Sequence, residues 1–254
     1  KALYDFICQQ FKPQKKSLIL ERLNLSGATY NGLLGKGFIR EESRIAQRIA
    51  YQDDIGKAEF ADEELIVLNE EQKVVAKSLR ETMDKGGFAT HLLHGVTGSG
   101  KTEVYLNAMQ AALDRGQGIL FLVPEVALTP QTVGRIRSRL SSYADVQTVV
   151  WNSHLSDGER LDAWMALASG AAKVVVGARS AVFAPIENPG LIVVDEEHEP
   201  AYKQDETPRY HGRDVAVYRA YLEGVLCVLG TATPSLETYR NVKRGKYGID
   251  RLTQ

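Results

Sequence analysis

Short apolar runs dominate the last two thirds of the chain. The runs are rich in Val, Ile and Leu and do not alternate with polar residues. Such runs are typical of strands that are buried on both faces of a parallel sheet. Segments with helical spacing separate most of them, so the pattern predicts a doubly wound α/β domain with a mostly parallel sheet. The expected elements are helices over 70–83 and 103–113, and strands over 91–94, 118–123, 147–150, 172–177, 190–194 and 225–230.

The first 50 residues follow a different pattern, in which apolar positions recur at helical spacing. It predicts three short helices at 1–11, 17–24 and 28–36. An extended segment is expected to follow from Phe38. This order predicts a small winged-helix domain, a module that often places its last helix on DNA. A small helical domain that only packs against its neighbour is the alternative. We therefore divide the chain into a winged-helix-like domain, an acidic connector and an α/β lobe, at 1–50, 51–68 and 69–254.

Charge is distributed unevenly between these parts. Residues 1–50 hold nine basic and four acidic side chains, whereas residues 51–75 hold two basic and eight acidic ones. The basic first module suggests a polyanionic partner.

Composition places the chain among globular proteins, with 44% hydrophobic and 25% charged residues over 254 positions. No apolar run approaches the roughly 18 residues of a membrane span, and no signal peptide is recognisable. We expect an excised fragment of a cytoplasmic protein, because the chain opens on Lys1 rather than Met. Cys8 and Cys227 are far apart and neither belongs to a C-x-x-C pair, so we expect reduced thiols and no zinc site in this chain.

The strongest local signal is the segment 95–102, which fits G-x-x-x-x-G-K-[ST] at every fixed position. Its glycines let successive backbone N–H groups point at phosphate oxygens, and the following helix offers its N-terminus to the anion. Lys101 is expected to reach the β- and γ-phosphates, and the Thr102 hydroxyl to hold Mg²⁺. The predicted nucleotide contacts are Gly95, Thr97, Gly98, Ser99, Gly100, Lys101 and Thr102.

An acidic group follows the apolar run 191–194 and reads Asp195-Glu196-Glu197-His198. Asp195, at the carboxyl end of a strand, is expected to hold Mg²⁺ beside Thr102. Glu196 is expected to polarise the water that attacks the γ-phosphate, which must lie in line with the leaving oxygen. Lys101, Asp195 and Glu196 are therefore the predicted catalytic residues of an ATP-hydrolysing site.

Further motifs resemble those of superfamily 2 helicases, whose fold is a RecA-like P-loop lobe. The segment 230–235 (Gly-Thr-Ala-Thr-Pro-Ser) resembles motif III, and 176–185 resembles motif Ib, which lies along nucleic-acid backbone. In that resemblance His198, Thr231 and Thr233 couple nucleotide state to DNA. Gln72 lies in a segment that resembles a Q-motif, where it would read the adenine edge.

The loop 199–214 mixes aromatic and basic residues, which stack on bases and meet phosphates respectively. The sequence of this loop, together with the motifs at 177–185 and 230–235, resembles that of the primosomal protein N′ (PriA) family of bacterial replication-restart helicases. The resemblance is close over 69–254 and less specific over 1–50. The residues that it assigns to DNA binding or coupling are Arg179, Tyr202, Lys203, Tyr210, His211 and Arg213; packing within the loop is the alternative for Tyr202 and Tyr210.

The resemblance implies a monomeric 3′→5′ DNA translocase that uses ATP and Mg²⁺, with no membrane partner. It implies binding to forks, D-loops and single-stranded DNA, and partnership with single-strand-binding protein and other primosome proteins. The family's zinc region, 3′-end-binding domain and second RecA-like lobe are not found in this chain. Because that second lobe carries the arginine finger, the isolated chain is expected to hydrolyse ATP poorly.

Other classes fit the sequence less well. A restriction-enzyme motor or repair translocase would share the phosphate loop and the acidic group, but not the aromatic loop. A small-molecule kinase would need a lid and an acceptor pocket, and a GTPase would need an N-K-x-D segment, which the chain lacks. A non-catalytic module is expected to lose Lys101, Asp195 or Glu196, and all three are intact.

Overall fold

The computed structural model describes residues 6, 16–23, 26–40, 67–143 and 146–253. The chain divides into two compact units, Lys1–Ala46 and Gln47–Gln254. The helix predicted over 1–11 lies outside the described residues apart from Phe6, which is helical. The predicted acidic connector lies outside them as well, except for Val67 and Leu68.

The first unit contains the two other short helices that the sequence predicts. They are α2 (Lys16–Arg22) and α3 (Gly27–Gly35). Ile19 and Tyr30 are buried between them, and partly buried apolar side chains pack around this pair. Residues 38 and 39 bend instead of forming a strand. A winged helix also needs a β-hairpin, so this assignment stays a prediction.

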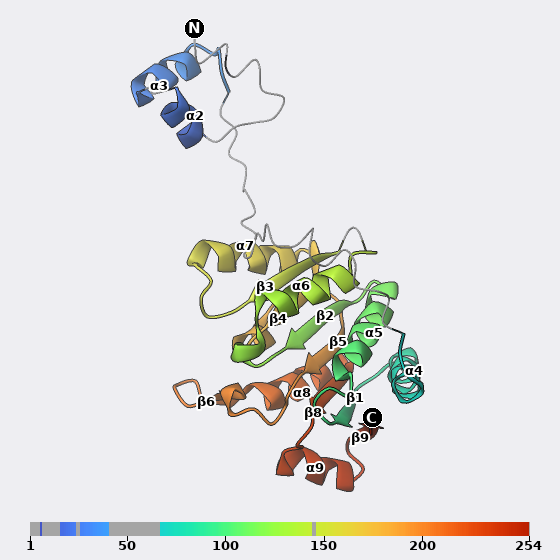
Figure 1. Ribbon diagram of the computed structural model, residues 1–254. Helices are drawn as coiled ribbons and strands as arrows, with labels where there is room; N and C mark the ends of the chain where they lie inside the picture. Colours follow the sequence, from blue (N-terminus) through green and yellow to red (C-terminus); the bar gives the residue numbers. More distant parts are fainter. Residues whose placement is uncertain (1–5, 7–15, 24–25, 41–66, 144–145, 254) are drawn as a thin grey trace. The chain divides into compact units, whose positions relative to one another are not determined.

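The second unit is built on a seven-stranded sheet in which every pair of neighbours is parallel (Figure 1). Its spatial order is β3-β4-β2-β5-β8-β1-β9. The strands are β1 (Ala89–Gly95), β2 (Gly118–Leu122), β3 (Gln147–Trp151), β4 (Ala172–Gly177), β5 (Pro189–Val194), β8 (Leu226–Thr231) and β9 (Gly248–Leu252). The first six confirm the predicted strands, and β9 is an edge strand that the apolar pattern did not reveal. The predicted α/β class is confirmed.

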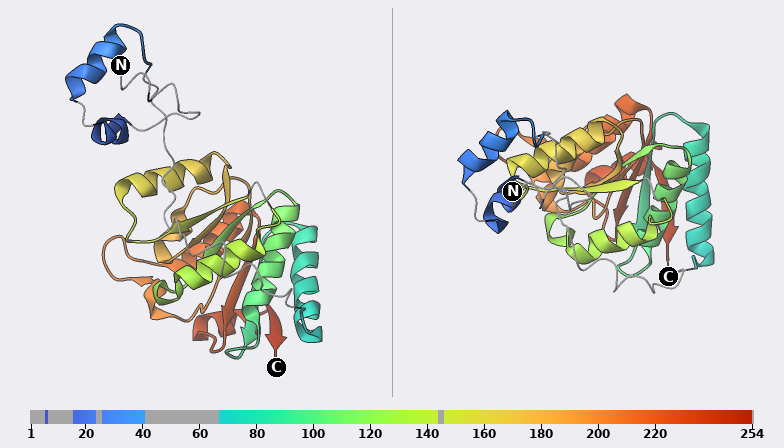
Figure 2. Two further views of the ribbon diagram at one scale, coloured as in Figure 1. Left: turned by 45° about the horizontal axis from the view of Figure 1, so that its top comes forward. Right: turned by 90° about the horizontal axis from the view of Figure 1, so that it is seen from above.

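Helices cover both faces of the sheet, which explains the continuous apolar runs (Figure 2). Helices α4 (Glu70–Lys85), α5 (Lys101–Asp114) and α6 (Pro130–Arg139) share one core with Ile119 and Phe121 of β2. Helices α7 (Asp157–Ala168) and α8 (Gly212–Glu223) share the other core with Leu120 and Leu122. Successive side chains of one strand point to opposite faces, so both sets must be apolar.

Short elements complete the edge where the functional loops lie. The loop after β5 holds a 3₁₀ turn, η3 (Pro200–Tyr202), and a two-stranded antiparallel hairpin, β6 (Lys203–Gln204) with β7 (Tyr210–His211). After β8, the Ser235 side chain caps helix α9 (Leu236–Lys243) by accepting from Thr238 N. Among the helices of the described residues, none combines the length and apolar character of a membrane span.

Candidate nucleotide-binding and coupling site

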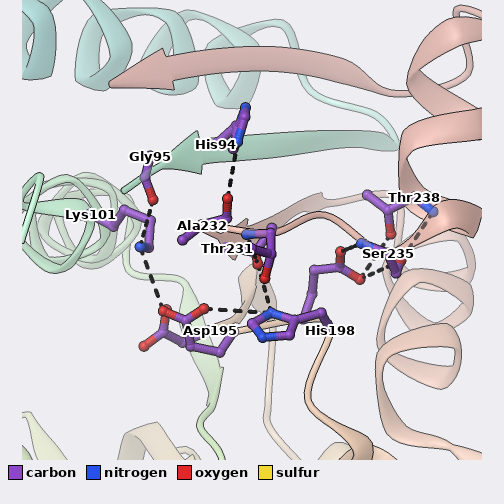
Figure 3. A network of polar contacts seen from close by, with 12 residues as sticks. His94, Gly95, Lys101, Asp195, His198, Thr231, Ala232, Ser235 and Thr238 are labelled. Atoms are coloured by element: carbon purple, nitrogen blue, oxygen red, sulfur yellow. Dashed lines mark hydrogen bonds and ion pairs between the residues drawn. The ribbon is translucent and has the colours of Figure 1, made fainter. Parts of the chain in front are cut away.

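Three functional loops meet at one edge of the sheet. The phosphate loop follows β1, the acidic group follows β5, and the segment 231–235 follows β8. Because β5, β8 and β1 are neighbouring parallel strands, their carboxyl ends lie side by side, where open α/β sheets bind ligands. Figure 3 shows side chains of the three loops joined in one network of polar contacts.

The phosphate loop has the backbone that its glycines predict. Gly98 and Gly100 have φ of 84° and 79°, a left-handed conformation that glycine adopts without steric cost. Helix α5 starts directly after Gly100, so the N–H groups of Lys101 and Thr102 have no acceptor within the helix. The Ser99 hydroxyl is buried without a hydrogen-bond partner in the described part of the chain. These unpaired donors fit a bound phosphate.

Lys101 lies inside this loop with only 7% of its surface exposed. Its Nζ donates to the carbonyl oxygen of Gly95 at 2.9 Å and lies 3.5 Å from Oε1 of Glu196. The ammonium group therefore bridges the phosphate loop and the acidic group. It is placed where a nucleotide phosphate would meet both.

Gln72 braces the loop from helix α4. Its Oε1 accepts from the backbone N–H of Asn69 at 2.9 Å. The backbone N–H of Gln72 donates in return to Oδ1 of Asn69 at 2.8 Å. Its Nε2 donates to the carbonyl oxygen of Ser99 at 3.0 Å. Both ends of the amide thus have protein partners, and the contact with adenine stays a prediction.

Asp195 is held by two buried tyrosines. The Tyr105 hydroxyl donates to Oδ1 of Asp195 at 3.0 Å, and the Tyr202 hydroxyl donates to its carbonyl oxygen at 2.7 Å. Burial, and then the neighbouring charge of Glu196, raise the pKa of the Asp195 carboxyl group. Burial and the Asp195 charge raise the pKa of both phenols well above the ordinary value, so both remain hydrogen-bond donors.

The predicted magnesium ligands suit that ion chemically. The Thr102 hydroxyl and the Asp195 carboxylate are hard oxygen donors, the kind that Mg²⁺ prefers. Within the described ranges, no group of three or more His, Cys, Asp or Glu side chains forms a site for a metal ion. Mg²⁺ is commonly bound through one or two carboxylates together with substrate phosphates and waters, and its assignment to Thr102 and Asp195 stays a prediction.

Glu196 lies between Lys101 and His198 in a chain of polar contacts. Its Oε2 is 3.6 Å from Nδ1 of His198, and the same Nδ1 is 2.7 Å from Oγ1 of Thr231. Thr231 Oγ1 in turn accepts from the backbone N–H of Thr233 at 3.0 Å. The predicted coupling residues His198, Thr231 and Thr233 therefore connect the acidic group to the loop after β8.

Glu197 is a functional candidate that the sequence reading did not select. Its side chain is fully buried and accepts hydrogen bonds from α8 and from the start of α9. The donors are Arg213 Nη1 at 3.0 Å, Ser235 N at 2.7 Å, Ser235 Oγ at 2.9 Å and Thr238 Oγ1 at 3.0 Å. The side chain next to the predicted catalytic carboxylate thus ties both helices to the site.

Two of the predicted DNA contacts need correction. Tyr202 is 1% exposed, so stacking of its ring on a base is wrong for this structure. Arg213 is 6% exposed and pairs with Glu197 and Asp214, so its guanidinium group is not available to a phosphate. These attractions outweigh burial and raise the pKa of Arg213. Both residues contact the acidic group, and their alternative role in coupling stays a prediction.

The other predicted DNA residues lie around the β6–β7 hairpin and remain candidates. Arg179 donates to the carbonyl oxygens of Ala201 and Lys203 and lies 5.9 Å from the centre of the Tyr210 ring. Tyr210 meets the ring of Phe183 edge-on at 5.1 Å, and Phe183 is 60% exposed. Lys203 is exposed and pairs with Asp205 at 3.0 Å. This Arg179–Phe183–Tyr210 cluster offers an aromatic face and positive charge together.

Among the histidines outside the acidic group, His91, His94 and His211 are partly buried, whereas His154 is exposed. Burial, and then Arg213, lower the pKa of His211, whose ring precedes helix α8. His94 Nε2 lies 3.2 Å from the carbonyl oxygen of Ala232, and His91 Nδ1 lies 2.6 Å from Oδ2 of Asp250. The contact of His94 joins β1 to the loop after β8, whereas that of His91 joins β1 to the edge strand β9.

Comparison with known families now identifies the group to which this site belongs. Residues 65–236, which include the phosphate loop and the acidic group, match the family described as type III restriction enzyme, res subunit. The chain belongs to this family.

Two curated relatives of the chain are described as replication restart proteins. The chain is 43% identical over 231 residues to replication restart protein PriA of Bacillus subtilis, covering 91% of the chain and 28% of that protein. It is 40% identical over 253 residues to the protein of that name from Chlamydia pneumoniae, covering 99% of the chain and 33% of that protein. The predicted resemblance is confirmed. The chain spans about a third or less of the length of these relatives.

Solved structures support the fold. The chain matches a structure described as RecG bound to a three-way DNA junction with a TM-score of 0.53 and 20% identity, covering 77% of the chain and 25% of that one. It matches the DUF1998 helicase MrfA bound to DNA with a TM-score of 0.51 and 18% identity, covering 85% of the chain and 32% of that one. The predicted RecA-like helicase lobe is thereby confirmed as a fold.

Proposed function

We propose that the chain is the ATP-binding lobe of a 3′→5′ DNA helicase that acts in bacterial replication restart. The observation that carries this proposal is the meeting of the phosphate loop and the acidic group, with Lys101 Nζ 3.5 Å from Glu196 Oε1. The similarity to replication restart proteins supports the choice of DNA and of the restart pathway.

The proposed roles follow from the geometry of the site. ATP phosphates are bound by the loop 95–102, and Lys101 exchanges the Gly95 carbonyl oxygen for phosphate oxygens. Thr102 and Asp195 would hold Mg²⁺, which would supply positive charge beside the phosphates. Glu196 orients the attacking water and accepts its proton, while Lys101 stabilises the charge that develops on the phosphate. Gln72 keeps Ser99 in place beneath the nucleotide.

DNA is proposed to bind beside this site through the cluster of Arg179, Phe183 and Tyr210, together with Lys203. Phe183 and Lys203 are exposed, whereas Arg179 and Tyr210 are half-buried. Aromatic faces stack on bases, and cationic side chains attract the backbone. The hairpin is connected to the acidic group along the chain, because β6 and β7 lie between residues 195–198 and helix α8. At the start of α8, Arg213 donates a hydrogen bond to Glu197. A shift of the hairpin on DNA would therefore be transmitted to Glu196.

The whole protein is proposed to bind stalled forks, D-loops and single-stranded DNA in the bacterial cytoplasm, at the nucleoid, and to promote primosome assembly. Single-strand-binding protein and other primosome proteins are its proposed partners, and a monomer is its proposed state. Zinc is proposed only for parts of such a protein outside the present 254 residues.

The test is ATP hydrolysis by the full-length protein that carries this chain, with and without forked DNA, against its Glu196→Gln variant. We expect fork-stimulated turnover that Glu196→Gln reduces at least about 100-fold, because general-base catalysis contributes roughly 10²–10⁴-fold. The isolated chain should bind ATP yet turn over slowly, since arginine fingers contribute about 10³–10⁵-fold. Turnover that ignores DNA, or that survives in the variant, would refute the proposal.

A further inference from the structure

Tyr105 is a fully buried residue of helix α5, one turn beyond Lys101, and no motif draws attention to it. Its hydroxyl crosses the space between the phosphate-loop helix and the strand β5 to reach Asp195 Oδ1 at 3.0 Å. The contact therefore joins the helix that carries Lys101 and Thr102 to the carboxylate expected to act with them.

The space for this hydroxyl is created by Gly230 of β8. A Cβ atom at position 230 would lie 1.4 Å from the Tyr105 hydroxyl oxygen and 2.6 Å from its Cζ. On another side, the Phe121 ring packs against the Tyr105 ring at 5.7 Å between centres. The phenol is thus enclosed by Gly230 and Phe121, and its O–H donates to the Asp195 carboxylate rather than to water.

We propose that Tyr105 is a positioning residue for the metal site: its hydroxyl fixes the Asp195 carboxylate in the orientation that receives Mg²⁺ with the nucleotide. The inference rests on the proposed ATP site and adds a residue to it. A carboxylate whose rotamer is already fixed loses less freedom on binding the ion, and groups that orient metal ligands in this way commonly change metal affinity when removed.

The experiment measures nucleotide binding rather than turnover. The 254-residue chain is titrated with a fluorescent, non-hydrolysable ATP analogue at a series of Mg²⁺ concentrations, and again with the metal removed by chelation. Tyr105→Phe deletes only the hydroxyl group. We expect the Mg²⁺ concentration for half-maximal binding to rise about 10-fold, as for other residues that orient metal ligands, while metal-free nucleotide affinity stays within twofold.

Tyr143→Phe is the matched control. Tyr143 also donates its hydroxyl to an aspartate, Asp114 Oδ1 at 2.6 Å, near the far end of the same helix. This variant should leave the Mg²⁺ response unchanged.

Gly230→Ala removes the same hydrogen bond in another way, because the added methyl group displaces the Tyr105 hydroxyl. This variant should also raise the Mg²⁺ concentration needed for half-maximal binding. Thermal unfolding of each variant shows whether the chain remains folded under the conditions of the titration.

The outcomes separate the two proposals. If the unaltered chain binds the analogue with Mg²⁺ and Tyr105→Phe has the same Mg²⁺ requirement, the positioning role is wrong and the ATP site stands. An equal loss of affinity with and without metal would also overturn it, because that result describes general damage to the phosphate loop. If the unaltered chain binds no nucleotide at any Mg²⁺ concentration, the proposed ATP site falls and this inference with it.

Discussion

At the scale of single residues, the backbone of Glu196 is the feature that most directly shapes the site. Glu196 has φ of 44°, in the left-handed region that is costly for a residue with a Cβ atom. Its neighbours hold it there: Asp195 N donates to the Leu122 carbonyl oxygen at 2.9 Å, and Glu197 N donates to that of Gly230 at 3.0 Å. The turn stops strand β5 and brings the Glu196 carboxylate near Lys101 and His198.

This strain predicts an inverted order of stability for two variants. Glycine relieves the left-handed backbone and alanine does not, so Glu196→Gly should be more stable than Glu196→Ala by about 1 kcal/mol. At Glu81, an exposed position inside helix α4, the same pair should have the opposite order by about 1 kcal/mol. The measurement is the free energy of unfolding in urea for all four variants. An alanine variant at 196 as stable as the glycine variant would show that the turn stores no strain.

At the scale of elements, Glu197 connects four segments around one buried carboxylate. It follows β5, packs against the end of β8, and receives donors from the start of α8 and from the cap of α9. A buried carboxylate of this kind is tolerated because each partner offsets part of the cost of removing it from water. The ion pair is therefore better regarded as a device that fixes the relative position of α8 and α9 than as a source of net stability.

Removal of both partners should cost less than the sum of the two single removals. Glu197→Ala leaves the buried Arg213 with one carboxylate fewer and should lower the free energy of unfolding by about 3–5 kcal/mol. The double change Glu197→Ala with Arg213→Met should cost clearly less than the sum of the two single changes, because the uncompensated charge is gone. Lys77→Ala, which loses only an exposed ion pair with Glu81, is the control and should change stability by less than about 1 kcal/mol. Additive effects at Glu197 and Arg213 would contradict the coupling.

The elements also show how far sequence reasoning reaches. The six buried strands were predictable because strands with helices on both faces need apolar side chains on both. Strand β9 was not, because Gly-Ile-Asp-Arg-Leu is mixed in polarity and pairs only with β1 at the sheet edge. The β6–β7 hairpin, with two residues in each strand, is too short to carry a periodic signal.

The site divides in the same way. The phosphate loop and Asp195–Glu196 are recognisable because their chemistry fixes residue type at fixed spacing. Tyr105 and Glu197 carry no such signal, because their partners are distant in the sequence. The order β5-β8-β1 in the sheet brings those partners close in space. Tyr202 and Arg213 were misjudged because aromatic and basic residues in a loop suggest a surface, whereas here they fold back on the acidic group.

At the scale of the whole molecule, charge is distributed unevenly along the chain. The first 50 residues have an excess of five positive charges, and the α/β lobe from residue 76 onward has equal numbers of each sign. Within the first unit, Lys16 is already engaged, since its Nζ lies 4.5 Å from the centre of the buried Tyr30 ring. Lys36, at the end of α3, is exposed.

We expect Lys15→Glu with Lys36→Glu, in the full-length protein, to weaken binding to forked DNA without altering nucleotide binding. Each lost phosphate contact should reduce the slope of log affinity against log salt by about 1, so the pair should reduce it by about 2. Fluorescence anisotropy with a labelled fork at several salt concentrations measures both quantities. The control carries the same change of charge on the exposed lysines of α4, as Lys77→Glu with Lys85→Glu, and should preserve the slope. If the first pair of changes leaves fork affinity and slope intact, the prediction of a DNA-binding module is wrong, and the unit serves packing or a contact with protein.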